Sequence, residues 1–390
     1  MSERTYDIAL FGATGFTGKL VAEYLLLHAP PGVRWALAGR NRKKLEDVKR
    51  ELSAQDARAA SLDIVIADTG DEASLEELAR KSKVVCTTVG PYMKYGRALV
   101  SACALHGAHY CDLTGEVPFM RESIDRNDGR ARESGARIVH ACGFDSLPSD
   151  LGVLMVHDHA KRTWNEDLAW DKMFAGETSG GFSGGTIATM FELLTAAKKD
   201  KTMRRLLGNP YALDPRDGGH RGPDGGDARG VRYDDDLRMW TGPFLMASTN
   251  TRVVRRSNAL LDHAYGPSFR YSEAMSFGRG PKGFAMATAV TAGLGAFILA
   301  ATVTPTRKLL ERTLLPAPGE GPSKAARDKG FFVVRHVAES TGGHRINARI
   351  VGKSDPGYGE TAKMLGESAL CLALDEKALP ARAGVLTPAT

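Results

Sequence analysis

Near the start of the chain, a glycine-spaced turn lies between an apolar run and a helical pattern. The stretch reads "YDIALFGATGFTGKLVAEYLL", Tyr6 to Leu26, and places Gly12, Gly15 and Gly18 in GxxGxxG spacing. Glycines permit a tight turn and a close approach of the backbone to a ligand, and the free N–H groups at a helix start attract phosphate. In this context of strand, turn and helix, the spacing predicts the first unit of a dinucleotide-binding domain.

Apolar, β-rich runs continue through the first 150 residues and alternate with helical patterns. They are "YDIALFG", "VRWALAG", "LDIVIAD", "KVVCTTVG", "AHYCDLTG" and "ARIVHACG". Such alternation is typical of an α/β fold with a doubly wound parallel sheet and right-handed crossovers. Because each run is apolar almost throughout, we expect helices on both faces of the sheet. The pattern changes near Leu151, where longer mixed segments begin.

The residues after the second predicted strand distinguish between the two nicotinamide dinucleotides. NAD-binding domains usually carry an acidic residue there for the ribose hydroxyls, but this chain has Arg40, Asn41 and Arg42. Two guanidinium groups could bind a 2′-phosphate through charge-assisted hydrogen bonds. The sequence therefore favours NADP(H). The alternative is a solvated basic helix start that continues into Lys43 and Lys44.

Other predicted cofactor contacts lie at strand ends, because ligands of open α/β sheets bind beyond the carboxyl ends of the strands. Asp68 ends the third strand, where it could face the adenine or simply enter the next helix. The full predicted set is Gly12, Ala13, Thr14, Gly15, Phe16, Thr17, Gly18, Arg40, Asn41, Arg42, Asp68, Thr88, Val89, Gly90 and Pro91.

Composition limits the class of protein. The 390 residues carry 52 basic and 46 acidic side chains that are dispersed along the chain, and this favours no nucleic-acid partner. Five cysteines without a CxxC pair argue against a secreted disulfide framework. The N-terminus lacks the pattern of a signal peptide. We therefore expect a cytoplasmic protein.

One long uncharged segment, Ala285 to Val303, is bracketed by Lys282 and Arg307. Its length would just span a bilayer, but its Ala, Thr and Gly content makes it a weak span. The favoured interpretation is a buried helix or one at an oligomer interface, which leaves a homodimer open. The next is a helix that lies in a membrane surface or lines a lipid-sized pocket. A transmembrane span ranks last.

Seven blocks of sequence carry a resemblance to a known family. They are "GATGFTG", "AGRNRKKL", "TTVGPYMKYG", "YCDLTGE", "GFDSLPSDLG", "SGGT" and "GYGETAKM", in this order and across nearly the whole chain. The chain resembles the saccharopine dehydrogenase-like oxidoreductases, and more narrowly their trans-acting enoyl reductase branch.

The resemblance implies three parts: a Rossmann domain over 1–148, a mixed α/β domain over 149–350, and a C-terminal segment over 351–390 that packs back on the first domain. It implies NADPH-dependent reduction of an unsaturated acyl chain carried by a polyketide synthase. The alternatives are an imine reductase of saccharopine type, whose cluster of substrate-binding cations is not evident here, and an NADP-binding protein on a lipid surface without turnover. Relatives usually continue past "GVLTPAT", which suggests a short or trimmed C-terminus.

Reduction of a conjugated double bond requires a donor for the developing oxyanion and a source of a proton. The catalytic candidates are Tyr92, after the fourth strand, and Asp145 and Ser146, after the sixth. For Asp145 and Asp150, capping of the following helix is the favoured interpretation. The backbone of Ser183 to Thr186, at a predicted helix start, could also hold negative charge. No Tyr-x-x-x-Lys pair of a short-chain dehydrogenase is present at the expected place.

Two further stretches are assigned no chemistry. His157 and His159, with Asp158 between them, alternate along a helix and point to different faces, so we expect no metal site. The glycine- and aspartate-rich stretch "DPRDGGHRGPDGGDARG" is interpreted as a surface loop.

Overall fold

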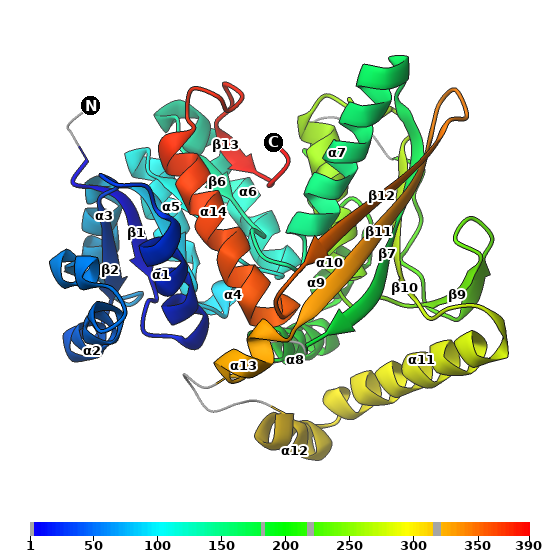
Figure 1. The fold of residues 1–390 in the computed structure, drawn as a ribbon, viewed down its shortest axis with the longest axis horizontal. Helices are drawn as coiled ribbons and strands as arrows, with labels where there is room; N and C mark the ends of the chain where they lie inside the picture. The colour runs from blue at the N-terminus through cyan, green and yellow to red at the C-terminus, as the bar shows by residue number, and fades with distance from the viewer. Residues whose placement is uncertain (1–3, 181–183, 217–221, 315–320) are drawn as a thin grey trace.

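The computed structural model describes residues 4–180, 184–216, 222–314 and 321–390, which form two sheets with helices packed around them (Figure 1). Sheet A has seven parallel strands in the order β13-β6-β5-β4-β1-β2-β3. They are β1 (Tyr6–Phe11), β2 (Trp35–Gly39), β3 (Asp63–Ile66), β4 (Ser82–Thr87), β5 (His109–Cys111), β6 (Arg137–Val139) and β13 (Gly384–Leu386). The predicted doubly wound parallel sheet and its first six strands are confirmed.

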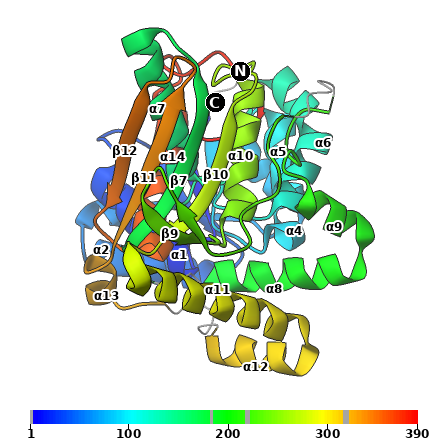
Figure 2. The ribbon, with the colours of Figure 1, turned by 90° about the vertical axis from the view of Figure 1, so that its right-hand side faces the viewer.

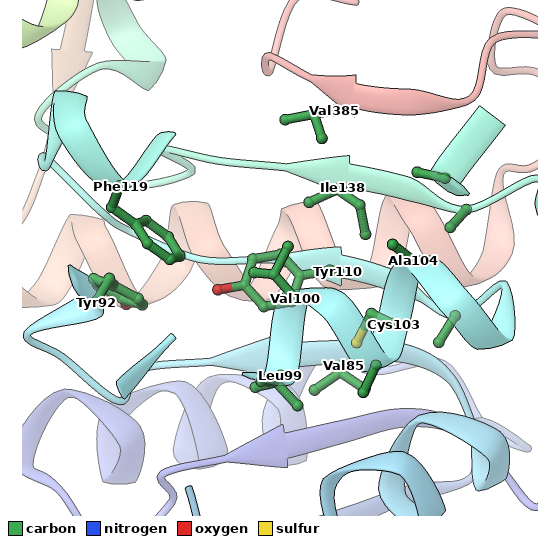
Figure 3. Packing of buried hydrophobic residues seen from close by; sticks show 14 of the residues in the cluster. Val85, Tyr92, Leu99, Val100, Cys103, Ala104, Tyr110, Phe119, Ile138 and Val385 are labelled. Carbon is green, nitrogen blue, oxygen red and sulfur yellow. The ribbon is translucent and has the colours of Figure 1, made fainter. Parts of the chain in front are cut away.

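Helices cover both faces of sheet A, as its apolar strands require. One face packs against α1 (Phe16–His28), α2 (Arg42–Ser53) and α14 (Thr361–Leu374). The other packs against α3 (Glu72–Lys81), α5 (Arg97–His106) and α6 (Val117–Ser134). Figure 3 shows the second core, where Val100 and Cys103 of α5 lie against Tyr110 and Ile138 of the sheet.

The point in sheet A where the strand order reverses determines where a ligand can bind. Strand β1 pairs with β2 on one side and with β4 on the other. The chain therefore winds away from β1 in both directions, and the connections leave a crevice at the carboxyl ends of β1 and β4. This switch point is the usual ligand site of an open α/β sheet.

Sheet B is mixed and has six strands in the order β12-β11-β7-β10-β9-β8. Strand β7 is parallel to β10 and antiparallel to β11. The strands are β7 (Leu168–Ser179), β8 (Arg232–Asp234), β9 (Met239–Gly242), β10 (Arg270–Ser276), β11 (Phe331–Ser340) and β12 (Arg345–Gly352), and the helices α7 (Leu147–Trp164) and α10 (Ala247–Leu260) pack against the sheet.

The C-terminal segment returns to sheet A, as the resemblance implied. Helix α14 packs beside α1, and Val385 of β13 pairs with Ile138 of β6. Asp150 fixes this return, because its carboxylate accepts hydrogen bonds from the Ser257 hydroxyl at 2.5 Å and the Ala389 amide at 2.9 Å. The N-cap of α7 is Ser146, so Asp150 is not a helix cap and the favoured interpretation of it as a cap was wrong.

The remaining elements lie between or beside the two sheets. They are η1, a 3-10 helix (Ala57–Ser61), α4 (Tyr92–Tyr95), α8 (Gly184–Lys199), α9 (Lys201–Gly208), α11 (Gly280–Thr302), α12 (Thr304–Leu314), α13 (Lys324–Asp328) and η2, a π-helical turn (Pro356–Glu360). Helices α11 and α12 run along one side of the molecule (Figures 1 and 2). Only 11% of the most apolar part of α11 is buried. The expectation that the helix over 285–303 is buried was wrong, since only a narrow stripe of α11 contacts the rest of the protein.

Candidate active site

A cavity of about 1100 Å³ lies between the carboxyl ends of sheet A and the second domain. Its wall begins at the glycine turn, residues 15–18, and continues over residues 88–92 and 143–145. The opposite wall is largely apolar. It comes from sheet B, from α8, from the first turns of α10 and from the middle of α11. The cavity therefore joins the predicted nucleotide site to an apolar space.

The glycine turn has the shape that a dinucleotide requires. Gly12 has a φ of +97°, and a Cβ there would lie 2.7 Å from the Val89 side chain. A Cβ on Gly18 would lie 2.1 Å from the Gly12 carbonyl oxygen, so α1 can approach β1 only with glycine at this position. No side chain caps the start of α1, where Gly15 is the N-cap. The N–H groups of this turn can hold a pyrophosphate.

The three residues after β2 have different surroundings. Asn41 caps α2 by accepting a hydrogen bond from the Lys44 amide at 3.0 Å. The guanidinium of Arg42 lies 3.9 Å from the Glu46 carboxylate. Arg40 is exposed, and no carboxylate of the described residues pairs with it. Arg40 is therefore the better placed of the two arginines to bind a 2′-phosphate, and the roles of all three in cofactor binding stay predictions.

Asp68 and the residues after β4 lie at neighbouring strand ends. The Asp68 carboxylate accepts a hydrogen bond from the Gly70 amide at 2.9 Å and shapes the loop before α3, while Asp71 caps that helix. The Thr88 hydroxyl donates to the Gly12 carbonyl at 3.2 Å. Thr88, Gly90 and Pro91 line the cavity beside the glycine turn, where the nicotinamide end of a dinucleotide would lie.

The three catalytic candidates differ in what they present to the cavity. The Tyr92 ring lines it, but the buried hydroxyl donates to the Thr87 carbonyl at 3.2 Å. Ser146 is fully buried and donates to the Asn250 side chain at 3.0 Å. Asp145 lines the cavity, and none of the described residues hydrogen-bonds its carboxylate. Of the three, Asp145 has the side chain best placed to exchange a proton with a ligand.

Burial determines the protonation of Asp145. It raises the pKa of this carboxyl from its ordinary 3.8 to about 6, because removal from water disfavours the charged form. A carboxyl group with such a pKa keeps a proton in a fraction of molecules near neutral pH and can act as a general acid. Asp145 also does not cap α7, whose N-cap is Ser146.

Two residues that support the site were missed as site residues, although both stand in the quoted blocks. Glu116 accepts hydrogen bonds from the amides of Tyr92 and Met93 at 2.8 and 2.7 Å and thereby fixes the start of α4. The Tyr358 ring packs edge-on against Phe16 at 4.9 Å, and its hydroxyl accepts from the Gly184 amide at 3.0 Å. Tyr358 thus joins the glycine turn to the start of α8.

The predicted helix of the "SGGT" block is present, since α8 begins at Gly184. Ser183 lies outside the described residues. The amide of Gly184 is already bonded to Tyr358. Within this part of the chain, the Gly185 backbone lines the cavity and stays a candidate for holding negative charge.

The glycine- and aspartate-rich stretch is more than a surface loop. The described part includes residues 222–230, of which 226–229 line the cavity. Asp224 pairs with the buried Arg255 at 2.8 Å, and Asp227 pairs with the buried Arg252. These ion pairs hold the loop against α10, which its composition did not reveal.

The predicted absence of a metal site was argued from His157 and His159. The structure places the His157 ring 3.3 Å from the Asp158 carboxylate, while His159 packs against Trp164. No cluster of three or more metal-ligating side chains occurs among the residues that the structure describes.

Comparisons with known proteins agree with this arrangement. A model of the saccharopine dehydrogenase NADP-binding domain matches residues 8–139. A candidate trans-acting enoyl reductase of Mycobacterium tuberculosis is 45% identical over 99% of this chain and 93% of its own. A trans-acting enoyl reductase of Mycobacterium bovis is 41% identical over 100% of this chain and 94% of its own.

A solved structure shares the fold. Saccharopine dehydrogenase (L-Glu forming) from Saccharomyces cerevisiae has a TM-score of 0.51 and 13% identity, with 98% of this chain and 94% of that chain covered. At this identity the likeness concerns the fold alone.

A parallel sheet with a glycine turn at its switch point, closed by a second sheet, defines a two-domain NADP-binding oxidoreductase. The residues of the turn fit that cofactor, since only glycine can occupy positions 12 and 18. The chain belongs to the saccharopine dehydrogenase-like oxidoreductases and, within them, to the trans-acting enoyl reductases.

Proposed function

We propose that this protein uses NADPH to reduce a carbon–carbon double bond next to the carbonyl group of a long acyl chain. The observation that carries the proposal is the cavity, which runs without interruption from the glycine turn to an apolar wall formed by α8, α10 and α11. Bound NADPH supplies the hydride. An acyl chain can occupy the apolar part while its reacting end lies near residues 88–91.

The residues of the chain position the substrate and supply a proton. Residues 15–18 would hold the pyrophosphate, and Arg40 the 2′-phosphate. Addition of hydride at the β-carbon places negative charge on the carbonyl oxygen and requires a proton at the α-carbon. The Asp145 carboxyl, with a pKa of about 6, is our candidate for the donor of that proton. The apolar wall excludes water from the reacting atoms.

We further propose that a partner synthase carries the acyl chain. The relatives are named trans-acting enoyl reductases, a term that implies action on a chain held by another protein. The composition of the cavity supports an acyl substrate over an amino acid. Arg229 and Arg252 are the cations of its described lining, and Arg252 is already paired with Asp227.

A substrate series tests this function. NADPH oxidation is measured with 2-enoyl thioesters of increasing chain length, and with mixtures of an amino acid and an aldehyde or keto acid. We expect turnover only with the enoyl thioesters and faster turnover with longer chains. Turnover confined to the amino acid mixtures would instead establish the imine reductase. No turnover with any pair, together with tight NADPH binding, would favour a non-catalytic protein.

A pair of variants on one helix sharpens the chain-length test. Leu294 faces the cavity, whereas Leu299 lies on the exposed side of α11. Leu294→Trp fills part of the apolar space, and we expect it to shift the preferred substrate to shorter chains. Leu299→Trp is the matched control and is expected to keep the wild-type preference. An unchanged preference in Leu294→Trp would contradict the placement of the acyl chain.

A further inference from the structure

Helix α11 is apolar on its exposed side as well as on its inner side. Towards the protein, Thr291, Leu294 and Ile298 line the cavity. On the opposite side, Met286 is 56% exposed and Leu299 is 68% exposed. The exposed residues between them are small and uncharged: Thr288, whose hydroxyl donates to the Phe284 carbonyl, Ala289, Ala292, Gly293, Gly295 and Ala296. A surface helix of a water-soluble protein normally turns charged residues to this side.

The apolar surface continues onto α12, where Leu309 is 62% exposed. We call Met286, Leu299, Val303 and Leu309, together with the small residues between them, the α11–α12 surface. Exposed apolar patches that are contiguous and bordered by polar residues mark sites of interaction with a protein or a membrane.

Cations border the α11–α12 surface at both ends. Arg279 and Lys282 are exposed at the start of α11. At the far end Lys308 is exposed, and Lys198 of α8 reaches the Thr302 carbonyl at 3.3 Å. In the sequence from 279 to 310 there is no acidic residue. An apolar surface with basic ends is complementary to a membrane that contains anionic lipids.

The connections of α11 determine how it can meet a bilayer. It is long and apolar enough to cross one. However, β10 precedes it and β11 follows it, and both strands pair with β7 in sheet B. Both flanks therefore belong to the same folded sheet on the same side of the helix. The helix can lie in the plane of a membrane surface, and it cannot cross the membrane without breaking sheet B.

We propose that the α11–α12 surface docks this protein on the surface of an anionic membrane. The same helix then separates the lipid from the cavity, with its inner side against the acyl-binding space. This arrangement would let an apolar substrate pass between bilayer and cavity without crossing water. The docking itself does not depend on the proposed reaction, because it is measured with no substrate present.

Vesicle binding tests the proposal with the full-length protein. Sedimentation or flotation is carried out with vesicles of phosphatidylcholine alone and with added phosphatidylglycerol. The variant Met286→Asp/Leu299→Asp should weaken binding about tenfold or more for each side chain that no longer enters the interface. The matched control is Leu105→Asp/Met155→Asp, which alters exposed apolar residues on α5 and α7 and should bind as the wild type does.

Charge and position are tested separately. Lys282→Gln/Lys308→Gln should lower affinity for the anionic vesicles about fivefold per charge and leave binding to neutral vesicles unchanged. Trp240, whose ring lies 4.7 Å from Phe284 at the start of α11, is a built-in reporter. Its fluorescence should be quenched by lipids with brominated acyl chains.

Two results would overturn the proposal. One is equal vesicle binding by the α11 variant and the wild type. The other is an absence of vesicle binding together with a wild-type dimer that the α11 variant converts to a monomer, as measured by light scattering. The second result would assign the α11–α12 surface to a second copy of this chain. NADPH affinity, measured on every variant, confirms that the site and the fold are intact.

Discussion

Asp145 and Asp150 stand five positions apart, yet their environments are opposite. Asp145 faces the cavity without a hydrogen bond from the described residues, and Asp150 is buried between α10 and the C-terminal segment. The sequence indicates that both acids follow the sixth strand. It cannot separate them, because the partners of Asp150 are Ser257 and Ala389, more than a hundred positions away.

The first prediction concerns Asp145→Asn. We expect the turnover of an enoyl thioester to fall about a hundredfold, the low end of what a general acid contributes. Folding raises the pKa of this carboxyl from 3.8 to about 6, so the folded state bears a cost for its charge above pH 6. The variant should therefore unfold at an equal or higher temperature at pH 8.

The pH dependence of the rate shows whether Asp145 donates the proton or has no part in the reaction. If its protonated form donates, the wild-type rate of the chemical step falls as the pH rises above about 6, and the Asp145→Asn profile is flat over this range. Single-turnover measurements from pH 5 to 9 would show this. A variant that keeps the wild-type rate and profile would remove Asp145 from the mechanism.

The second prediction concerns Arg40, which has no carboxylate partner among the described residues. Arg40→Gln should raise the Kd for NADPH about 10- to 100-fold, because charge-assisted hydrogen bonds contribute about 1.5–3 kcal/mol each. The Kd for NADH should stay the same. Arg42→Gln, which removes a guanidinium beside Glu46, is the matched control with a smaller expected effect. Fluorescence titration measures both, and a parallel loss of NADH affinity would contradict the assignment.

At the scale of elements, the start of α1 is the part that the sequence predicts best. The turn is local, and its glycines are required by contacts within residues 12–18 and with Val89 after β4. By contrast, the junction of η2 and α8 joins Phe16, Gly184 and Tyr358. No local pattern brings these three positions together. The sequence alone could indicate only that each of them lies in a block that resembles the family.

The third prediction compares two Gly→Ala substitutions in helices. In Gly18→Ala the new methyl group would lie 2.1 Å from the Gly12 carbonyl oxygen, which forces α1 away from β1. We expect NADPH affinity to fall below detection and the protein to lose stability. Gly129→Ala in α6 meets no atom within 4 Å and should be neutral or slightly stabilising, since alanine is the better helix former. Calorimetry with and without NADPH measures both, and binding by Gly18→Ala would contradict the close approach.

At the scale of the whole molecule, the two sheets differ in how far they could be predicted. Sheet A follows from the alternation of strands and helices, which is a short-range pattern. Sheet B depends on the pairing of β7 with β10 and β11, whose residues lie about a hundred and about 160 positions further along the chain. The cavity between the sheets follows from that long-range pairing and was not predicted. For the same reason the sequence ranked a helix that lines a pocket or lies in a membrane surface only second for residues 285–303.

The fourth prediction concerns stability and pH. Among the carboxyl groups whose pKa is raised by burial, four reach a pKa of about 6 or 7: Asp145 and Asp214 at about 6, and Asp150 and Glu273 at about 7. A carboxyl group with a raised pKa binds more protons in the folded than in the unfolded state, so stability falls as the pH rises from the ordinary pKa of 3.8 or 4.5 to the raised value. We expect the free energy of unfolding to decrease as the pH rises from about 4 to about 7, by on the order of 1 kcal/mol per pH unit for each group.

One group acts in the opposite direction at lower pH. Burial, with Arg137 nearby, lowers the pKa of His109 from 6.5 to about 4, and this stabilises the protein as the pH rises towards 6.5. This single group offsets only part of the loss from the four carboxyl groups, so stability should still fall from pH 5 to 7. Urea unfolding at five pH values measures this. A free energy of unfolding that rises from pH 5 to 7 would contradict the burial of the four carboxyl groups.

The return of the C-terminal segment to sheet A has a consequence for synthesis. Helix α14 and strand β13 leave the ribosome only after residues 140–360 have emerged. Until then the face of β4 and β5 that Leu365 and Leu372 cover has no partner, and β6 is an open edge. Incomplete domains with exposed apolar faces and strand edges are prone to aggregate. The nucleotide-binding domain therefore cannot complete its fold until residues 361–386 have been synthesised.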